Sequence, residues 1–322
     1  MLTFPLLPNE LWFKIFLFDV TNKEVSLVSS QLNKIFNNES LRLSRVEVLL
    51  ASRGITVANN NLDSYKEIIL SHFPNTNPSL ITRYEKTPDL TLSRILLEED
   101  ANNLCLIADR IPLIRPQDDG FKECSKLQKR KMIIDLLNQH SQEIAKIDEI
   151  DLTSLQLTSI PSELTFFKGL KKINLSNNKI KTIPEDFSNS FHELEKLQID
   201  FNPIYTLPTH FGKEWKNLKS LSLAGLKIKN LDANFGCYFT ELEFLELSSG
   251  QLDTIPTGFG KGWSKILNLY LHRNKFCELP NCFGDNWKKI EFIQILNNPM
   301  LKNKDGIIQS LNAKFPELIK LS

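Results

Sequence analysis

The sequence has no excess of charge of either sign, since its 322 residues include 39 lysines and arginines and 38 aspartates and glutamates, for a net charge of +1. Proteins that bind nucleic acids carry a strong basic excess, and disordered acidic tails carry the opposite imbalance. The balance therefore argues against both classes. The fractions of hydrophobic residues (41%) and charged residues (24%) are typical of a folded protein. The length predicts roughly two domains.

Cysteine is scarce and irregularly spaced. The five cysteines are Cys105, Cys124, Cys237, Cys277 and Cys282. A secreted protein that depends on disulfides usually has an even and denser set of cysteines. We therefore expect free thiols in a reducing compartment.

Long hydrophobic runs are also absent. No segment reaches the roughly 18 uninterrupted apolar residues that a membrane-spanning helix needs. The first twenty residues are apolar, but Pro5, Lys14 and Asp19 interrupt them, and no small-residue cleavage site follows. The sequence therefore predicts a soluble cytoplasmic protein, located in the eukaryotic cytosol or, for a bacterial effector, in the cytosol of the host.

Catalytic motifs are missing as well. The five histidines show no H-E-x-x-H spacing, and no glycine-rich phosphate loop occurs. Cys277 and Cys282 flank a repeated proline near His272, but we interpret them as core thiols rather than zinc ligands. The sequence predicts a non-catalytic binding protein without catalytic residue, metal, cofactor or small-molecule substrate.

A repeat of about 24 residues dominates the chain from Ile147 to residue 300. Its pattern is L-x-x-L-x-L-x-x-N-x-L-x-x-[IL]-P. The second unit shows it clearly as Leu170, Ile173, Leu175, Asn178, Ile180, Ile183 and Pro184. Seven units can be aligned, and four of them carry the asparagine. This is the pattern of leucine-rich repeats, which predicts an α/β solenoid, a horseshoe with a parallel concave sheet, preceded by an all-α N-terminal region.

A second set of repeated residues lies in the return half of each unit. Aromatic residues recur in two registers: Phe187, Phe211, Phe235, Phe259 and Phe283, and then Phe191, Trp215, Phe239, Trp263 and Trp287. A regular aromatic ladder is what packing between stacked coils requires, so we expect it to fill the outer core rather than to bind a ligand. The repeated asparagine is expected to satisfy backbone groups in the turn that leaves each strand.

The residues between the strand leucines should face the concave side of the sheet. Aromatic residues and arginine are enriched at binding hot spots. On this basis the predicted client-binding residues are Lys196, Asp200, Phe201, Phe244, Tyr270, His272, Arg273 and Phe292. The alternative is that these are scattered surface side chains without a role in binding.

Residues 4–41 predict two or three short amphipathic helices with more apolar surface than so small a segment can bury. Their motifs resemble the F-box, which opens with leucine-proline, then glutamate-leucine, then isoleucine-phenylalanine. The matching stretches are Leu7-Pro8, Glu10-Leu11, Ile15-Phe16 and Leu27-Val28-Ser29, whereas Leu32 stands where the family usually has tryptophan. F-box segments are often followed by leucine-rich repeats.

The resemblance implies that the chain is a substrate-recognition adaptor of a Skp-cullin-F-box type ubiquitin ligase. The N-terminal segment would bind the Skp adaptor and the repeats an unknown protein client. The residues carried over from the family as adaptor contacts are Leu7, Pro8, Leu11, Ile15 and Val28. Two alternatives stay open: an N-terminal helical cap for the solenoid, and a leucine-rich-repeat scaffold or secreted effector without a ligase link.

These observations divide the chain into four parts. We expect an F-box-like domain at 1–45, a helical spacer and cap at 46–146, the repeats at 147–300 and a C-terminal helical cap at 301–322. Within the spacer, long helices are predicted over 90–111 and 122–147. The basic residues Lys126, Lys129, Arg130 and Lys131 are expected to form a solvated helix face.

Overall fold

The computed structural model describes residues 46–47, 49–50, 71, 88–117, 119–316, 318 and 320–321. The chain divides into two compact units, residues 1–51 with 56–93, and residues 52–55 with 94–322. All of the repeats lie in the second unit. The predicted F-box-like helices and their adaptor contacts lie outside the described residues and stay predictions.

Helices precede the repeats. Helix α6 spans Pro88–Ala108, α7 spans Lys126–Gln139 and α8 spans Ser141–Ile144, with short 3-10 turns η2 (Pro112–Ile114) and η3 (Asp119–Glu123) between α6 and α7. The single helix predicted over 122–147 is wrong in its extent, because His140 leaves the α-helical conformation between α7 and α8. Helix α7 begins at a capping box in which Ser125 and Gln128 satisfy each other's backbone amides.

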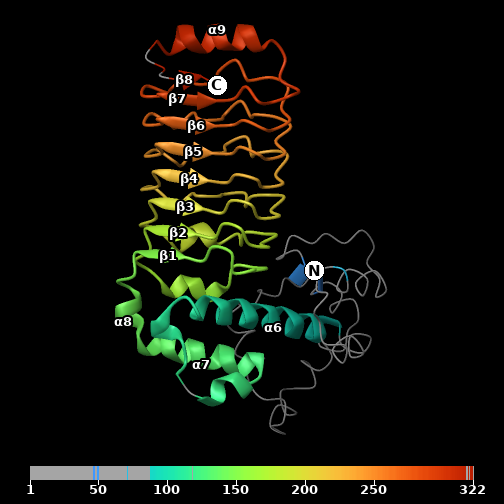
Figure 1. Ribbon diagram of the computed structural model, residues 1–322, viewed down its shortest axis with the longest axis vertical. Helices are drawn as coiled ribbons and strands as arrows, with labels where there is room; N and C mark the ends of the chain where they lie inside the picture. The colour runs from blue at the N-terminus through green and yellow to red at the C-terminus, as the bar shows by residue number, and fades with distance from the viewer. Residues whose placement is uncertain are drawn as a thin grey trace, which may run out of the picture. The chain divides into compact units, whose positions relative to one another are not determined.

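The repeats form a parallel sheet whose strands follow chain order (Figure 1). Its strands are β1 (Glu149–Asp151), β2 (Lys172–Asn174), β3 (Lys196–Gln198), β4 (Ser220–Ser222), β5 (Phe244–Glu246), β6 (Asn268–Tyr270), β7 (Phe292–Gln294) and β8 (Lys320–Leu321). The central residue of each of the first seven strands is between 0% and 5% exposed. Because side chains alternate along a strand, the two flanking residues face the opposite side, which is the open face of the sheet.

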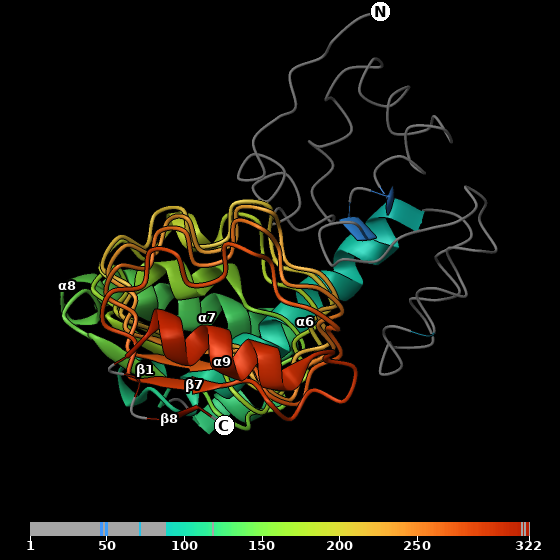
Figure 2. The ribbon, with the colours of Figure 1, turned by 90° about the horizontal axis from the view of Figure 1, so that it is seen from above.

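The solenoid predicted from the leucine spacing is confirmed, since seven repeated strands stack in register with their leucines and isoleucines in one core. Seen from above, the strands lie along one side of the stack and the return segments along the other (Figure 2). Strand β8 is not foreseen by the repeat, because its two residues follow helix α9 and pair with β7 outside the 24-residue period.

The repeated asparagines bridge neighbouring coils. The amide of Asn202 donates to the carbonyls of Leu175 and Ile199, both at 3.0 Å, and its Oδ1 accepts from the amide of Ile180. Asn178, Asn274 and Asn298 also bond to backbone groups of the preceding coil. All four are buried, so the predicted role of the asparagine in satisfying turn backbone is confirmed.

The aromatic ladder fills the outer core, as predicted. Phe191, Trp215, Phe239, Trp263 and Trp287 are at most 5% exposed. Edge-to-face contacts join Trp215 to Phe211 and Trp263 to Phe259, and Trp263 stacks on Trp287. The indole nitrogens differ in their partners. Trp263 donates to the carbonyl of Gly236 at 2.8 Å, whereas the buried indole nitrogen of Trp215 has no partner among the described residues. In the coil before Trp215, Ser188 stands at the position that Gly236 has in the coil before Trp263, and it belongs to a 3-10 turn, η5 (Phe187–Asn189).

This difference predicts unequal losses of stability on replacing two tryptophans. Trp263→Phe removes ring volume and leaves the carbonyl of Gly236 without its donor, whereas Trp215→Phe removes ring volume together with an unsatisfied donor. We expect Trp263→Phe to lower the free energy of unfolding by about 1 to 2 kcal/mol more than Trp215→Phe. Urea unfolding followed by far-UV circular dichroism measures the difference, and equal losses would contradict the hydrogen-bond argument.

Helices α6 and α7 contact the first coil. Arg130 of α7 forms a buried ion pair with Glu163, which lies in the 3-10 turn η4 (Ser162–Phe166). The expectation that Arg130 belongs to a solvated basic face is therefore wrong, although Lys126 and Lys131 are exposed. Burial raises the pKa of the Glu163 carboxyl, and the charge of Arg130 opposes this shift. Asn103 of α6 donates to Ser159 at 2.7 Å.

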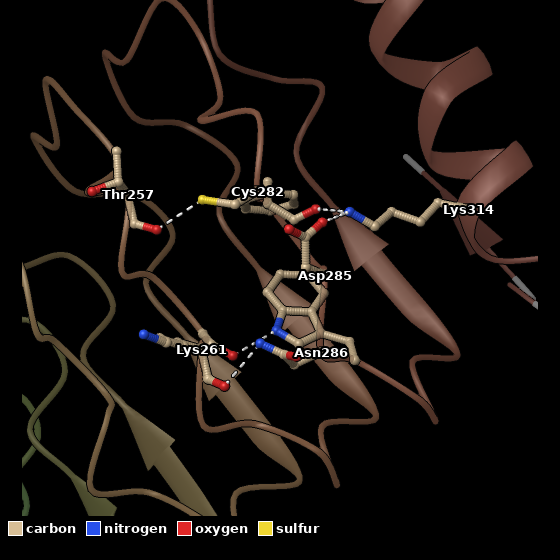
Figure 3. A network of polar contacts seen from close by, with 9 residues as sticks. Thr257, Lys261, Cys282, Asp285, Asn286 and Lys314 are labelled. Carbon is tan, nitrogen blue, oxygen red and sulfur yellow. Dashed lines mark hydrogen bonds and ion pairs between the residues drawn. The ribbon is translucent and has the colours of Figure 1, made fainter.

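Helix α9 (Lys304–Lys314) packs on the last coil. The ring of Phe315 stacks on Trp287 with centroids 6.1 Å apart, so Phe315 extends the aromatic ladder by one step. Lys314 donates to the carbonyl of Phe283 at 2.8 Å and pairs with Asp285 (Figure 3). The last apolar layer of the solenoid is thus covered. Within the described part of the chain, no helix has the length and hydrophobicity needed to traverse a bilayer.

Candidate functional site

The open face of the sheet carries an aromatic group on its last three repeated strands. Phe244 on β5, Tyr270 on β6 and Phe292 on β7 lie side by side, with Tyr270 5.4 Å from Phe244 and 5.1 Å from Phe292 between ring centroids. The His272 ring lies 6.5 Å from Tyr270. We call these four residues the face cluster. All are half-buried, so each presents part of its ring to solvent.

The strand register explains why these rings meet. Phe244 and Phe292 both pair with Asn268 at the first position of β6, and Tyr270 stands two residues further along the same strand. Neighbouring parallel strands are about 4.8 Å apart, a spacing at which large side chains on one face must touch. The sequence pattern therefore places the cluster, and the structure adds its ring contacts.

Glu246 lies beside the cluster, although it is not among the predicted client-binding residues. It pairs in register with Tyr270, and its carboxylate accepts from the amide of Ser248 at 3.2 Å. Burial raises the pKa of Glu246, and burial together with the Glu246 charge raises the pKa of Tyr270. Its position between strand leucines places it on the open face. The sequence alone does not show whether a lysine or arginine pairs with it.

His272 and Arg273 are consecutive residues beside the aromatic rings of the site. Burial and the adjacent Arg273 charge lower the pKa of His272, which favours its neutral form at pH 7. The buried Nδ1 of His272 makes no hydrogen bond with any residue that the structure describes. Arg273 is exposed and has a positive φ of 57°. Positive φ is uncommon for residues with long side chains.

Phe201 occupies the same backbone position three coils before Arg273, with a φ of 54° and 57% of its surface exposed. Gly225 is its neighbour in the next coil. A Cβ added to Gly225 would lie 2.5 Å from Cδ1 of Phe201, so the Phe201 ring packs directly over that glycine backbone. The structure thus fixes an exposed aromatic ring in a conformation that a bulky residue rarely adopts.

Asp200 is a bridge between coils. Its carboxylate accepts from Ser222 Oγ at 2.6 Å and from the amide of Ala224 at 2.7 Å, and its second oxygen accepts from Ser176 Oγ at 3.4 Å. Burial raises its pKa, and these hydrogen bonds oppose the shift. Asp200 therefore holds three coils in register, and its contribution to the open face is mainly its negative charge.

The predicted client-binding residues thus fall into two groups. Phe244, Tyr270, His272 and Phe292 are brought together in the face cluster, with Arg273 at its edge. Lys196, Asp200 and Phe201 belong to the β3 coil. The coil between the groups presents only small residues, Ser220, Ser222 and Ala224. Their assignment as client contacts is a prediction.

The return side of the solenoid contains a shallow cavity of roughly 430 Å³ lined by Thr257, Cys282 and Asn286, among others. Its polar groups already bond to neighbouring coils (Figure 3). The Cys282 thiol donates to the carbonyl of Thr257 at 2.8 Å, and the Asn286 amide donates to the carbonyl of Lys261 at 3.1 Å. These contacts serve the packing of the coils, so the open face is the better candidate site.

Comparison with protein families agrees with this fold. Residues 169–190, which contain strand β2, match the family model described as Leucine Rich Repeat. No F-box family model matches the chain. The parallel sheet and the bridging asparagines fit a solenoid of the leucine-rich-repeat type.

Proposed function

We propose that the protein is an interaction scaffold that binds a protein client through the open face of its solenoid. The observation that carries this proposal is the face cluster. Three aromatic rings, of which Tyr270 contacts both Phe244 and Phe292, have the composition of a binding hot spot together with an arginine at the edge. Partly exposed rings in contact on one face are also the kind of apolar surface that marks an interaction site.

The finer proposal is that the scaffold is the substrate receptor of a Skp-cullin-F-box type ubiquitin ligase. It is supported by the F-box-like stretches at Leu7-Pro8, Glu10-Leu11 and Ile15-Phe16, followed by leucine-rich repeats. Such a receptor performs no bond chemistry. It accelerates ubiquitin transfer by holding the client near the ligase, which makes the encounter effectively intramolecular.

One capture experiment from eukaryotic lysate tests client binding by the scaffold separately from the link to a ubiquitin ligase. The full chain is expected to capture the Skp adaptor and a client. The double variant Leu7→Ala with Pro8→Ala should lose the adaptor, because truncating hot-spot residues typically costs about 2 kcal/mol or more each. It should retain the client, which binds elsewhere.

The control is Tyr270→Ala, which should lose the client and keep the adaptor. If the double variant still captures the adaptor, the assignment of Leu7 and Pro8 as adaptor contacts is wrong. If the wild-type chain captures a client through Tyr270 but no adaptor, the protein is a scaffold or effector without a ligase link. That outcome would still support the proposal that the solenoid binds a protein client through its open face.

A further inference from the structure

We propose that the β4–β5 side of the face cluster binds a basic side chain, an arginine or lysine of the client. Glu246 would pair with its charge, and the rings of Phe244 and Tyr270 would contact its stem or guanidinium plane. This inference rests on the proposed function, since it names the partner chemistry of the same face.

Among the described residues, Glu246 has no basic partner, whereas three other glutamates of the solenoid have one. Three other glutamates of the solenoid pair with a lysine of the next coil: Glu149 with Lys172, Glu195 with Lys219, and Glu241 with Lys265. Among the residues that the structure describes, no lysine or arginine forms an ion pair with Glu246. A half-buried carboxylate without a counter-charge is unfavourable, so an incoming cation would be stabilised there.

The side chains of strand β4 that lie beside Glu246 are short. In register, Ser222 stands opposite Glu246 and Ser220 stands opposite Phe244 on strand β4. Both serines are short, so neither can cover the Phe244 ring or the carboxylate from that side. A long side chain lying over β4 would therefore reach the carboxylate and an aromatic ring at once. Aromatic faces attract cations, and arginine also stacks on them.

The charge around strand β4 is negative. Asp200 reaches the β4 coil from the other side, where it accepts from Ser222 and Ala224. Its charge is felt at Glu246, where it adds to the effect of burial in raising the pKa. An acidic client group placed over Ser222 would meet two negative carboxylates, whereas a basic group would be attracted by both.

The raised pKa of Glu246 has consequences for stability and pH. The groups that act on this carboxyl are Asp200 and Ser248, with Tyr270 beside it on β6. Because the folded state disfavours its ionised form, the stability it contributes is present at low pH and is lost as pH rises through the raised pKa. Glu246→Gln should therefore not lower thermal stability at pH 7. Binding of a cation should weaken as pH falls, since Glu246 gains its proton above the pH expected for an exposed glutamate.

The test uses the full chain with isotope-labelled tyrosine rings and short probe peptides in NMR titrations. The probes are acetylated, amidated tripeptides with serine at both ends and arginine, lysine, citrulline or glutamate at the centre. Citrulline has nearly the shape of arginine but no charge. The signal of Tyr270 is assigned from its loss in Tyr270→Phe. The variants are Glu246→Gln and the matched control Glu149→Gln, a glutamate of the same face that already has a lysine partner.

We expect a saturable shift of the Tyr270 signal with the arginine or lysine probe at millimolar concentration, and at least about tenfold weaker binding of the citrulline probe. Glu246→Gln should weaken binding of the basic probe by a similar factor without lowering the melting temperature, and Glu149→Gln should leave binding unchanged. Equal binding of citrulline, preference for glutamate, no saturable shift, or full binding by Glu246→Gln would each overturn the inference. The proposed function fails separately, if Tyr270→Ala still captures the client.

Discussion

Gly236→Ala is expected to lower the free energy of unfolding by about 3 kcal/mol or more. The residue has a φ of +83°, a conformation that alanine adopts only with strain. An added Cβ would also lie 2.3 Å from Cζ2 of Trp263 in the next coil. Because Trp263 donates its indole hydrogen to the Gly236 carbonyl, relieving the clash would also disturb that hydrogen bond. Urea unfolding followed by far-UV circular dichroism measures the loss.

The matched control is Gly262→Ala, in a neighbouring return segment. Gly262 does not have a positive φ, and its added Cβ would lie 3.1 Å from the nearest atom, the carbonyl oxygen of Cys237. We expect a change of no more than about 1 kcal/mol, since an ordinary backbone conformation tolerates alanine. Similar losses in both variants would mean that the packing of Trp263 against Gly236 does not limit stability.

Tyr270→Ala is expected to weaken binding of the captured client by at least about thirtyfold, which corresponds to roughly 2 kcal/mol. Tyr270 is the central ring of the face cluster, so its removal separates Phe244 from Phe292 as well as deleting its own contact area. Isothermal titration with the purified client measures the change in affinity.

The control for this prediction is Tyr205→Ala. Tyr205 is 57% exposed and lies under the ammonium of Lys227, outside the face cluster. The same truncation at Tyr205 should change affinity by less than about twofold, because scattered surface contacts contribute little. A larger loss at Tyr205 than at Tyr270 would place the binding surface outside the cluster.

The regular parts of this molecule could be predicted because each repeat imposes the same requirement. One L-x-L strand cannot bury its apolar face alone, so seven of them at a constant period specify stacking, register and the side that stays open. Asn202 and its equivalents follow from the same logic, since turn amides inside a stack must find partners. Phe244, Tyr270 and Phe292 could therefore be placed on neighbouring strands by counting residues.

The irregular parts depend on contacts between segments that no period links. Arg130 reads as one of four surface basic residues, and only the packing of α7 on the first coil brings it to Glu163. Strand β8 has two residues outside the repeat and pairs only because α9 returns the chain to the edge of the sheet. Whether a lysine or arginine reaches Glu246 depends on packing that spacing alone does not fix, and none of the described residues pairs with it. The adaptor contacts in residues 1–45 remain predictions from sequence.

Site-specific photo-cross-linking from the full chain shows whether a client binds the open face at the face cluster. A photoreactive phenylalanine at Asn268, which pairs in register with Phe244 and Phe292, is compared with one at Lys261, exposed on the return side. We expect the client to cross-link from position 268 and not from position 261. Cross-linking from position 261 with none from position 268 would contradict it.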